Sequence, residues 1–173
     1  MALMASSRHE VGTKTFPLVV YILVPLLALG LQSLLSLYFT SFDLIDLPLL
    51  VTIYYAISQR EPVSATLVGM VIGIAQDGLT HHPLGIFGIS KAIVGYMAAS
   101  LGVRVDTEHH GTRLLLVFGF TLLQSAILWL VVRHMLGQPF AWHGIHELLR
   151  AAVNALAGVI LFALLDLSRR RED

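Results

Sequence analysis

The chain has 173 residues, of which 56% are hydrophobic and only 13% are charged, and its formal net charge is zero. Soluble domains carry about a quarter charged residues, so this composition, with a mean hydropathy of +0.78, indicates an integral membrane protein. A separate soluble domain of ordinary size is not expected. The zero net charge gives no global basic field, so we expect no nucleic-acid partner. The chain has no cysteine, which excludes disulfides and thiolate metal sites.

Six apolar stretches are predicted to be transmembrane helices, because a bilayer core of about 30 Å needs about 20 apolar residues of helix. They are Phe16–Phe39, Asp46–Ser58, Pro62–Asp77, Gly85–Leu101, Arg113–Val132 and Ala151–Leu167. The first exceeds the apolar region of a signal peptide, so we expect it to be retained. The second and third are short and adjacent, which predicts a tight helical hairpin. Five spans are the alternative, if these two are partly re-entrant.

The distribution of basic residues supports six spans with both termini in the cytoplasm. One side of the membrane then holds Arg8, Lys14, Arg60, Arg104, Arg113, Arg169, Arg170 and Arg171, and the other holds Arg133 and Arg150. The predicted organisation is a cytoplasmic tail at 1–15, a six-helix domain at 16–168 and a basic cytoplasmic tail at 169–173. In the long outer connection, Phe140 and Trp142 are candidate membrane anchors, and His143–Leu149 is a candidate short interfacial helix.

The stretch 69–96 contains the most unusual polar residues of the chain. Asp77 closes the third apolar stretch and Lys91 lies inside the fourth, and ionisable groups in such places need a partner or a function. We expect either an Asp77–Lys91 ion pair that locks the hairpin or a contact with a ligand or partner. Small residues form a stripe on one side of the third, fourth and sixth predicted helices, and such stripes let helix backbones approach closely. The stripes are Gly69 and Gly73 with Asp77, then Gly88, Ala92, Gly95, Ala99 and Gly102, and in the last helix Ala151, Asn154, Ala155 and Gly158.

The remaining polar residues do not form a catalytic set. We expect Gln32, Gln124 and Asn154 to make hydrogen bonds between helices. The histidines of the outer loops, at 81, 82, 134, 143 and 146, lack a fixed ligand spacing, so we expect no metal and no cofactor. No nucleophile with a base and no pair of close carboxylates is present, so we expect no enzymatic activity.

The order of short motifs resembles the MreD family of bacterial rod shape-determining membrane proteins. The matching residues are Tyr54-Tyr55-Ala56, Gly69 to Gly73, Gln76-Asp77-Gly78, Pro83-Leu84-Gly85 and Gly95-Tyr96. The likeness extends over nearly the whole chain in length, span pattern and basic tail, and its most specific part is residues 69–96. The family often has a hydrophobic residue, or an acid followed by leucine, after the aspartate, where this chain has Gly78.

This resemblance implies a non-enzymatic scaffold in the bacterial cytoplasmic membrane, as part of the complex that elongates the cell wall. The partners that it implies are MreC directly, and MreB, RodA and a penicillin-binding transpeptidase in the wider complex. It also implies a fold similar to the substrate-binding S components of ECF vitamin transporters. The expected partner-binding or structural centre comprises Gly69, Gly73, Gln76, Asp77, Pro83, Gly85, Gly88, Lys91, Gly95 and Tyr96.

An alternative function is the binding of a small vitamin-like ligand from the outer side, in the manner of an S component. Its pocket would lie near Asp77, His81, His82, Trp142 and His146. The first span has no clean Ala-x-x-x-Ala surface for an energising module, which makes this alternative the weaker one.

Overall fold

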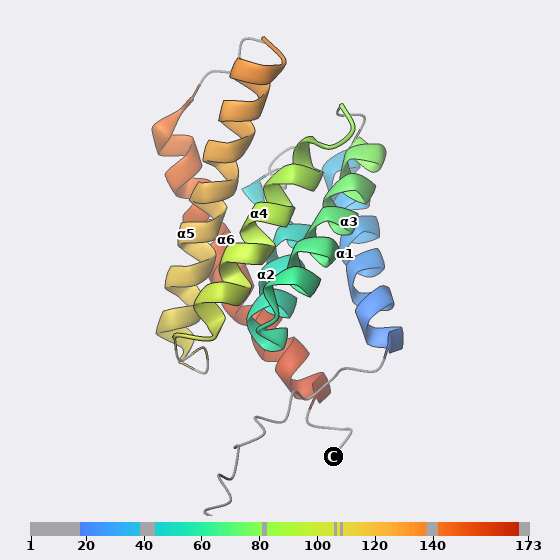
Figure 1. The fold of residues 1–173 in the computed structure, drawn as a ribbon, viewed down its shortest axis with the longest axis vertical. Helices are drawn as coiled ribbons and strands as arrows, with labels where there is room; N and C mark the ends of the chain where they lie inside the picture. The colour runs from blue at the N-terminus through green and yellow to red at the C-terminus, as the bar shows by residue number, and fades with distance from the viewer. Residues whose placement is uncertain are drawn as a thin grey trace, which may run out of the picture.

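The computed structural model describes residues 18–38, 44–80, 83–105, 107, 109–137 and 142–169. Within these residues the chain is all-α, as predicted, and each of the six apolar stretches coincides with one helix (Figure 1). The helices are α1 (Leu18–Tyr38), α2 (Leu47–Gln59), α3 (Pro62–Thr80), α4 (Ile86–Gly102), α5 (His110–Leu130) and α6 (Gly144–Arg169), and a π-helical turn, η2 (Val131–Met135), continues α5.

Four of the described helices are long and apolar enough to cross a membrane: α1, α3, α6, and α5 together with η2. The helices α2, with 13 residues, and α4, with 17, are shorter. At 1.5 Å per residue, α2 extends only about 20 Å, less than the hydrocarbon core of a bilayer. Length alone therefore supports a multi-pass membrane protein, and a full crossing by all six helices stays a prediction.

The outer surface of the bundle is apolar along most helices. Large aliphatic side chains are more than half exposed on four of them, for example Leu27 on α1, Val71 on α3, Leu115 on α5 and Ile160 on α6. A soluble protein rarely exposes a continuous apolar surface of this extent, whereas a lipid-facing surface requires it.

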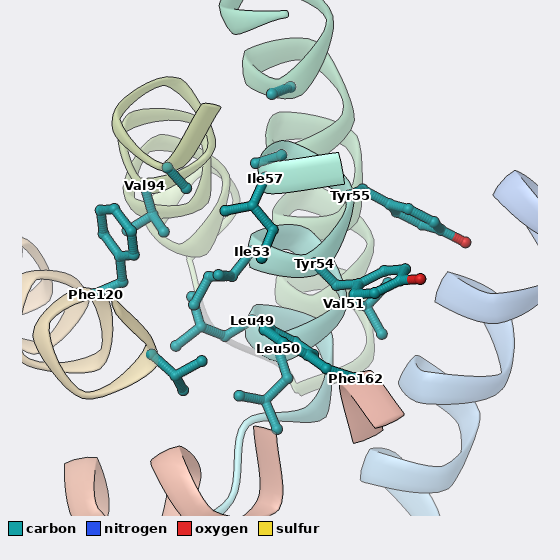
Figure 2. Packing of buried hydrophobic residues seen from close by; sticks show 14 of the residues in the cluster. Leu49, Leu50, Val51, Ile53, Tyr54, Tyr55, Ile57, Val94, Phe120 and Phe162 are labelled. Atoms are coloured by element: carbon teal, nitrogen blue, oxygen red, sulfur yellow. The ribbon is translucent and has the colours of Figure 1, made fainter. Parts of the chain in front are cut away.

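Helix α2 lies at the centre of the bundle (Figure 2). Every residue from Pro48 to Ile57 is buried, including Tyr54 and Tyr55, and the core cluster around them also takes in Val94 of α4, Phe120 of α5 and Phe162 of α6. A helix that is hydrophobic on all sides is buried either within protein or in the lipid of a membrane. This explains how α2 can be so short: its neighbours, rather than lipid, cover it.

The ends of α2 are fixed by local signals. Asp46 is the N-cap, its side chain accepts a hydrogen bond from Leu49 N at 3.0 Å, and Pro48 occupies the first turn, where its missing N–H costs nothing. At the other end Arg60 adopts a left-handed conformation with φ of 56°, which turns the chain directly into α3. The predicted tight hairpin between α2 and α3 is thus confirmed.

The α5–α6 hairpin extends beyond the other helices at the end where α2 begins (Figure 1). The helix α6 has 26 residues and is continuous from Gly144. The prediction of a separate interfacial helix over His143–Leu149 is therefore wrong, because these residues, from Gly144 on, form the first two turns of α6. Trp142 contacts Trp129 of α5 with ring centroids 6.3 Å apart, and Phe140 lies outside the described residues.

Candidate functional site

The helices α3 and α4 form the most extensive contact of the bundle, and glycines make this contact close. A Cβ atom added at Gly69 would collide with the backbone carbonyl of Lys91, and one at Gly73 would collide with the backbone of Phe87. A Cβ at Gly95 would lie 2.5 Å from the carbonyl oxygen of Ala65. The two helices therefore pack backbone against backbone, which only glycine permits at these positions.

The glycine stripes thus serve packing within this chain. Gly69, Gly73, Gly88 and Gly95 are all buried between α3 and α4. A partner helix could reach these four glycines only by separating α3 from α4. Of the two roles expected for them, partner binding and internal structure, the structure shows the internal one.

Asp77 connects the end of α3 to the start of α4. It is fully buried, and its Oδ2 accepts hydrogen bonds from Gly85 N at 2.8 Å and Gly88 N at 3.3 Å, while its Oδ1 accepts one from Phe87 N at 3.1 Å. The first N–H groups of a helix have no partner within the helix, and a carboxylate there satisfies them and complements the helix dipole. Asp77 is therefore a cap for α4 that is supplied by the preceding helix.

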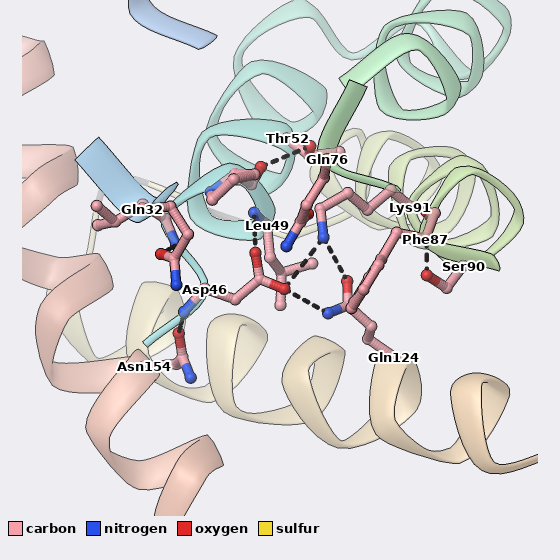
Figure 3. Close-up of polar contacts among 12 residues, drawn as sticks. Gln32, Asp46, Leu49, Thr52, Gln76, Phe87, Ser90, Lys91, Gln124 and Asn154 are labelled. Atoms are coloured by element: carbon pink, nitrogen blue, oxygen red, sulfur yellow. Dashed lines mark hydrogen bonds and ion pairs between the residues drawn. The ribbon is translucent and has the colours of Figure 1, made fainter. Parts of the chain in front are cut away.

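The expected ion pair between Asp77 and Lys91 is replaced by a different one. Lys91 Nζ lies 3.0 Å from Asp46 Oδ2 and also donates to Gln124 Oε1 at 3.2 Å (Figure 3). Gln124 Nε2 in turn donates to Asp46 Oδ2 at 2.7 Å, so the three side chains close a triangle. All three are at most 2% exposed. The physical reason for the difference is that the oxygens of Asp77 already bind backbone N–H groups, while Asp46 is open to Lys91.

Two further helices join this triangle. Asn154 of α6 accepts a hydrogen bond from Asp46 N at 2.9 Å and donates to Leu44 O at 2.6 Å, and Gln32 of α1 accepts one from Leu47 N at 3.1 Å. The prediction that Gln32, Gln124 and Asn154 bond between helices is confirmed. We call Gln32, Asp46, Lys91, Gln124 and Asn154 the polar centre; it links α1, α2, α4, α5 and α6 at the end where α2 begins.

A smaller polar cluster lies at the opposite end of the bundle. Asp166 of α6 accepts a hydrogen bond from the Tyr54 hydroxyl at 3.0 Å, and Arg113 NH1 lies 2.6 Å from its other oxygen. Arg113 also donates to Thr107 O at 2.7 Å. Tyr55 donates to Val20 O of α1 at 2.8 Å. Both ends of α2 are therefore tied to neighbouring helices by polar contacts.

The other candidate residues are placed in different environments. Gln76 is buried, and its side chain reaches towards Lys91 (Figure 3), but its Oε1 has no hydrogen-bond partner among the described residues. Gly85 has a φ of 101°, which the turn into α4 requires. Pro83 is exposed in the same turn, and Tyr96, 54% exposed, lies on the outer face of α4. His81 and His82 lie outside the described residues.

Sequence reasoning missed Asp46, which makes the most contacts in the polar centre. Its position before an apolar run that starts with Leu47 and Pro48 is typical of an N-cap, and this signal was available. Its partner Lys91 is 45 residues away, and no spacing rule connects the two.

The contacts of the polar centre connect helices to one another. The polar side chains of the centre bind one another or backbone groups, and among the described residues no group of three His, Asp or Glu side chains could hold a metal ion. Comparison with family models, curated proteins and solved structures finds no match to this chain. The likeness to MreD and to transporter S components therefore stays a prediction from the sequence.

Proposed function

We propose that this chain is a non-enzymatic membrane scaffold of the MreD type, which holds a single-span partner of the MreC type in a fixed geometry during cell-wall elongation. The observation that carries the proposal is the use of the motif residues 69–96 for internal rigidity. Asp77 caps α4, the glycines press α3 against α4, and Lys91 connects this helix pair to α2 and α5. A bundle locked in this way offers a stable surface, which is what a scaffold needs.

The partner-contacting surface that we propose lies on the outer face of α4. Of the ten candidate residues, Tyr96 is the one that lies within a helix and faces outward, at 54% exposure. Ile89, Ile93 and Met97 share this face at helical spacing and are also exposed. A tyrosine hydroxyl in an apolar surface needs a hydrogen-bond partner, which a partner helix could supply.

Site-specific photo-crosslinking tests this surface. A photo-reactive phenylalanine analogue at Tyr96 should crosslink to a co-expressed MreC-type protein, because it would lie in the contact. The same analogue at Leu115, which is 70% exposed on α5, is the matched control and should crosslink to lipid only.

Two different negative results would reject the proposed contact surface and the proposed scaffold function separately. Co-purification of the partner without a crosslink at Tyr96 would reject the surface and keep the scaffold. Absence of any complex, with a monodisperse and folded chain in hand, would reject the scaffold.

The three described residues of the alternative vitamin site, Asp77, Trp142 and His146, lie in different environments. Asp77 is fully buried with both oxygens occupied by backbone N–H groups, whereas Trp142 and His146 are exposed near the start of α6. We therefore do not propose the S-component function for this chain.

A further inference from the structure

Two charged groups near the start of α6 lack hydrogen-bond partners. Five buried side-chain nitrogen or oxygen atoms have no partner in the described part of the chain, and two of the five belong to charged groups: Glu147 Oε2 and Arg150 Nε. A buried charged group without hydrogen bonds costs several kcal/mol, of the order of 3, and a ligand that binds the accessible atoms of such a group would lower this cost.

Arg150 carries a positive charge that the polar centre does not neutralise. Its NH2 approaches Asp46 Oδ2 to 3.8 Å, which is too long for a hydrogen bond. Lys91, at 3.0 Å, already neutralises Asp46. A guanidinium has five N–H donors in a planar fork that fits a phosphate or a carboxylate, and the Arg150 side chain is 17% exposed, so a ligand can reach it.

Glu147 carries the complementary charge one turn away. Its Oε1 lies 3.8 Å from His146 Nδ1, again beyond hydrogen-bond distance, and its side chain is 12% exposed. Residues three apart on a helix are neighbours, with Cβ atoms about 5–6 Å apart. A phosphate and an ammonium joined by two carbons have a comparable separation, so one small zwitterionic group can contact both side chains.

The position of the pair along α6 corresponds to the headgroup level. The 26 residues of α6 extend about 39 Å, roughly 9 Å more than the hydrocarbon core, so one or both ends of the helix lie beyond that core. These turns still expose apolar side chains to their surroundings, namely Ile145 (79%), Leu148 (52%) and Leu149 (54%). Trp142, two residues before α6, contacts Trp129 of α5, and tryptophan is enriched at the membrane–water interface.

We propose that Arg150 and Glu147 bind the headgroup of a phospholipid that carries both a phosphate and a primary ammonium, in the leaflet around the α5–α6 end of the bundle. Arg150 donates to the phosphate, and Glu147 accepts from the ammonium. This site does not depend on the scaffold function, because it requires no protein partner.

Native mass spectrometry of the full chain with mixed lipids tests the proposal. The probes are phosphatidylethanolamine, phosphatidylcholine and phosphatidylglycerol with identical acyl chains. The choline ammonium has no N–H to donate, and the glycerol headgroup has no cation. We expect about tenfold stronger retention of phosphatidylethanolamine, as one charge-assisted hydrogen bond implies. Glu147→Gln should reduce this preference to near equality, whereas Arg150→Lys should weaken retention of all three lipids.

Matched controls keep the result interpretable. Arg133→Gln changes an exposed arginine at the same end of the bundle and should leave all three lipids unaffected. The melting temperature of each variant shows whether it folds. An unchanged ethanolamine preference in Glu147→Gln, or equal retention of the three lipids by the unmodified chain, would overturn the proposal. Stabilisation of lipid-free protein by soluble phosphoethanolamine, without lipid preference, would overturn the lipid assignment in favour of a free ligand.

Discussion

Asp46 is the residue on which the interior of the bundle depends. One of its oxygens accepts from the backbone of its own helix, and the other accepts from Lys91 and Gln124, which belong to α4 and α5. A buried ion pair contributes little net stability compared with apolar residues of the same shape, but removal of one partner leaves an uncompensated charge. The value of this pair is therefore in specifying which helices meet and in which register.

Lys91→Met tests this dependence at the residue scale. The substitution removes the closest cation from buried Asp46 and leaves only Arg150, at 3.8 Å, so we expect a loss of about 3–5 kcal/mol in the free energy of unfolding. Asp46→Asn with Lys91→Met should lose less than the sum of the two single variants, because no isolated charge remains. Reversible unfolding in mixed micelles gives the free energy of unfolding of the unmodified chain, of the two single variants and of the double variant. Strict additivity would show that the two side chains do not interact.

At the scale of the elements, α3 and α4 pack closely because glycines, which have no side chain, lie at their contact. Gly69 and Gly73 on α3 and Gly95 on α4 each face backbone atoms of the opposite helix. Asp77 then fixes the start of α4 relative to the end of α3. Packing and capping thus act together to hold one geometry.

Gly69→Ala should open this contact. The added methyl group would collide with the carbonyl of Lys91, and relief requires the helices to move apart, so we expect a loss of about 1–3 kcal/mol in the free energy of unfolding. Gly119→Ala on α5 is the matched control, since nothing lies within 4 Å of its added Cβ. It should be neutral or stabilising by up to about 1 kcal/mol, from helix propensity alone. Thermal unfolding of the two variants measures this difference. Equal changes in stability for Gly69→Ala and Gly119→Ala would contradict the close contact between α3 and α4.

At the scale of the whole molecule, successive helices run in opposite directions, so the start of α1 and the end of α6 lie at the same end of the bundle (Figure 1). The polar centre lies towards the other end, where the hairpin of α5 and α6 extends furthest. The two ends of the bundle therefore differ chemically. The end of the bundle that holds the start of α1 and the end of α6 is the one that the distribution of basic residues in the sequence predicts to face the cytoplasm.

Cysteine labelling tests this orientation, and the absence of native cysteine removes the background. Glu61→Cys and Arg104→Cys, both at exposed positions, should react with a membrane-impermeant maleimide only after the cells are opened. His134→Cys and His143→Cys, exposed at the other end, should react in intact spheroplasts. Labelling of all four positions from one side would contradict a six-span topology.

The sequence predicted the helices well, because runs of apolar residues directly determine which segments leave water. The start of the last helix was the exception: Gly144 to Arg150 is polar enough to look separate, yet it continues α6. In the candidate site, the sequence indicated that Asp77 needs a partner, but it did not identify the backbone N–H groups that Asp77 binds, since a cap that comes from the preceding helix depends on how the two helices cross. The pairing of Lys91 with Asp46 depends on the three-dimensional packing of α2 against α4, which no local pattern contains.

The burial of α2 from Pro48 to Ile57 affects how the protein enters the membrane during synthesis. With 13 residues and a carboxylate at its first end, α2 has neither the length nor the composition to settle in lipid by itself. Its charge is matched only when Lys91 emerges, 45 positions later. We therefore expect α2 to stay in the aqueous environment of the insertion machinery, and not to enter lipid, until α4 has been synthesised. A nascent chain that ends at Thr80 should leave a cysteine at Ile53 open to aqueous reagents, and the finished chain should not.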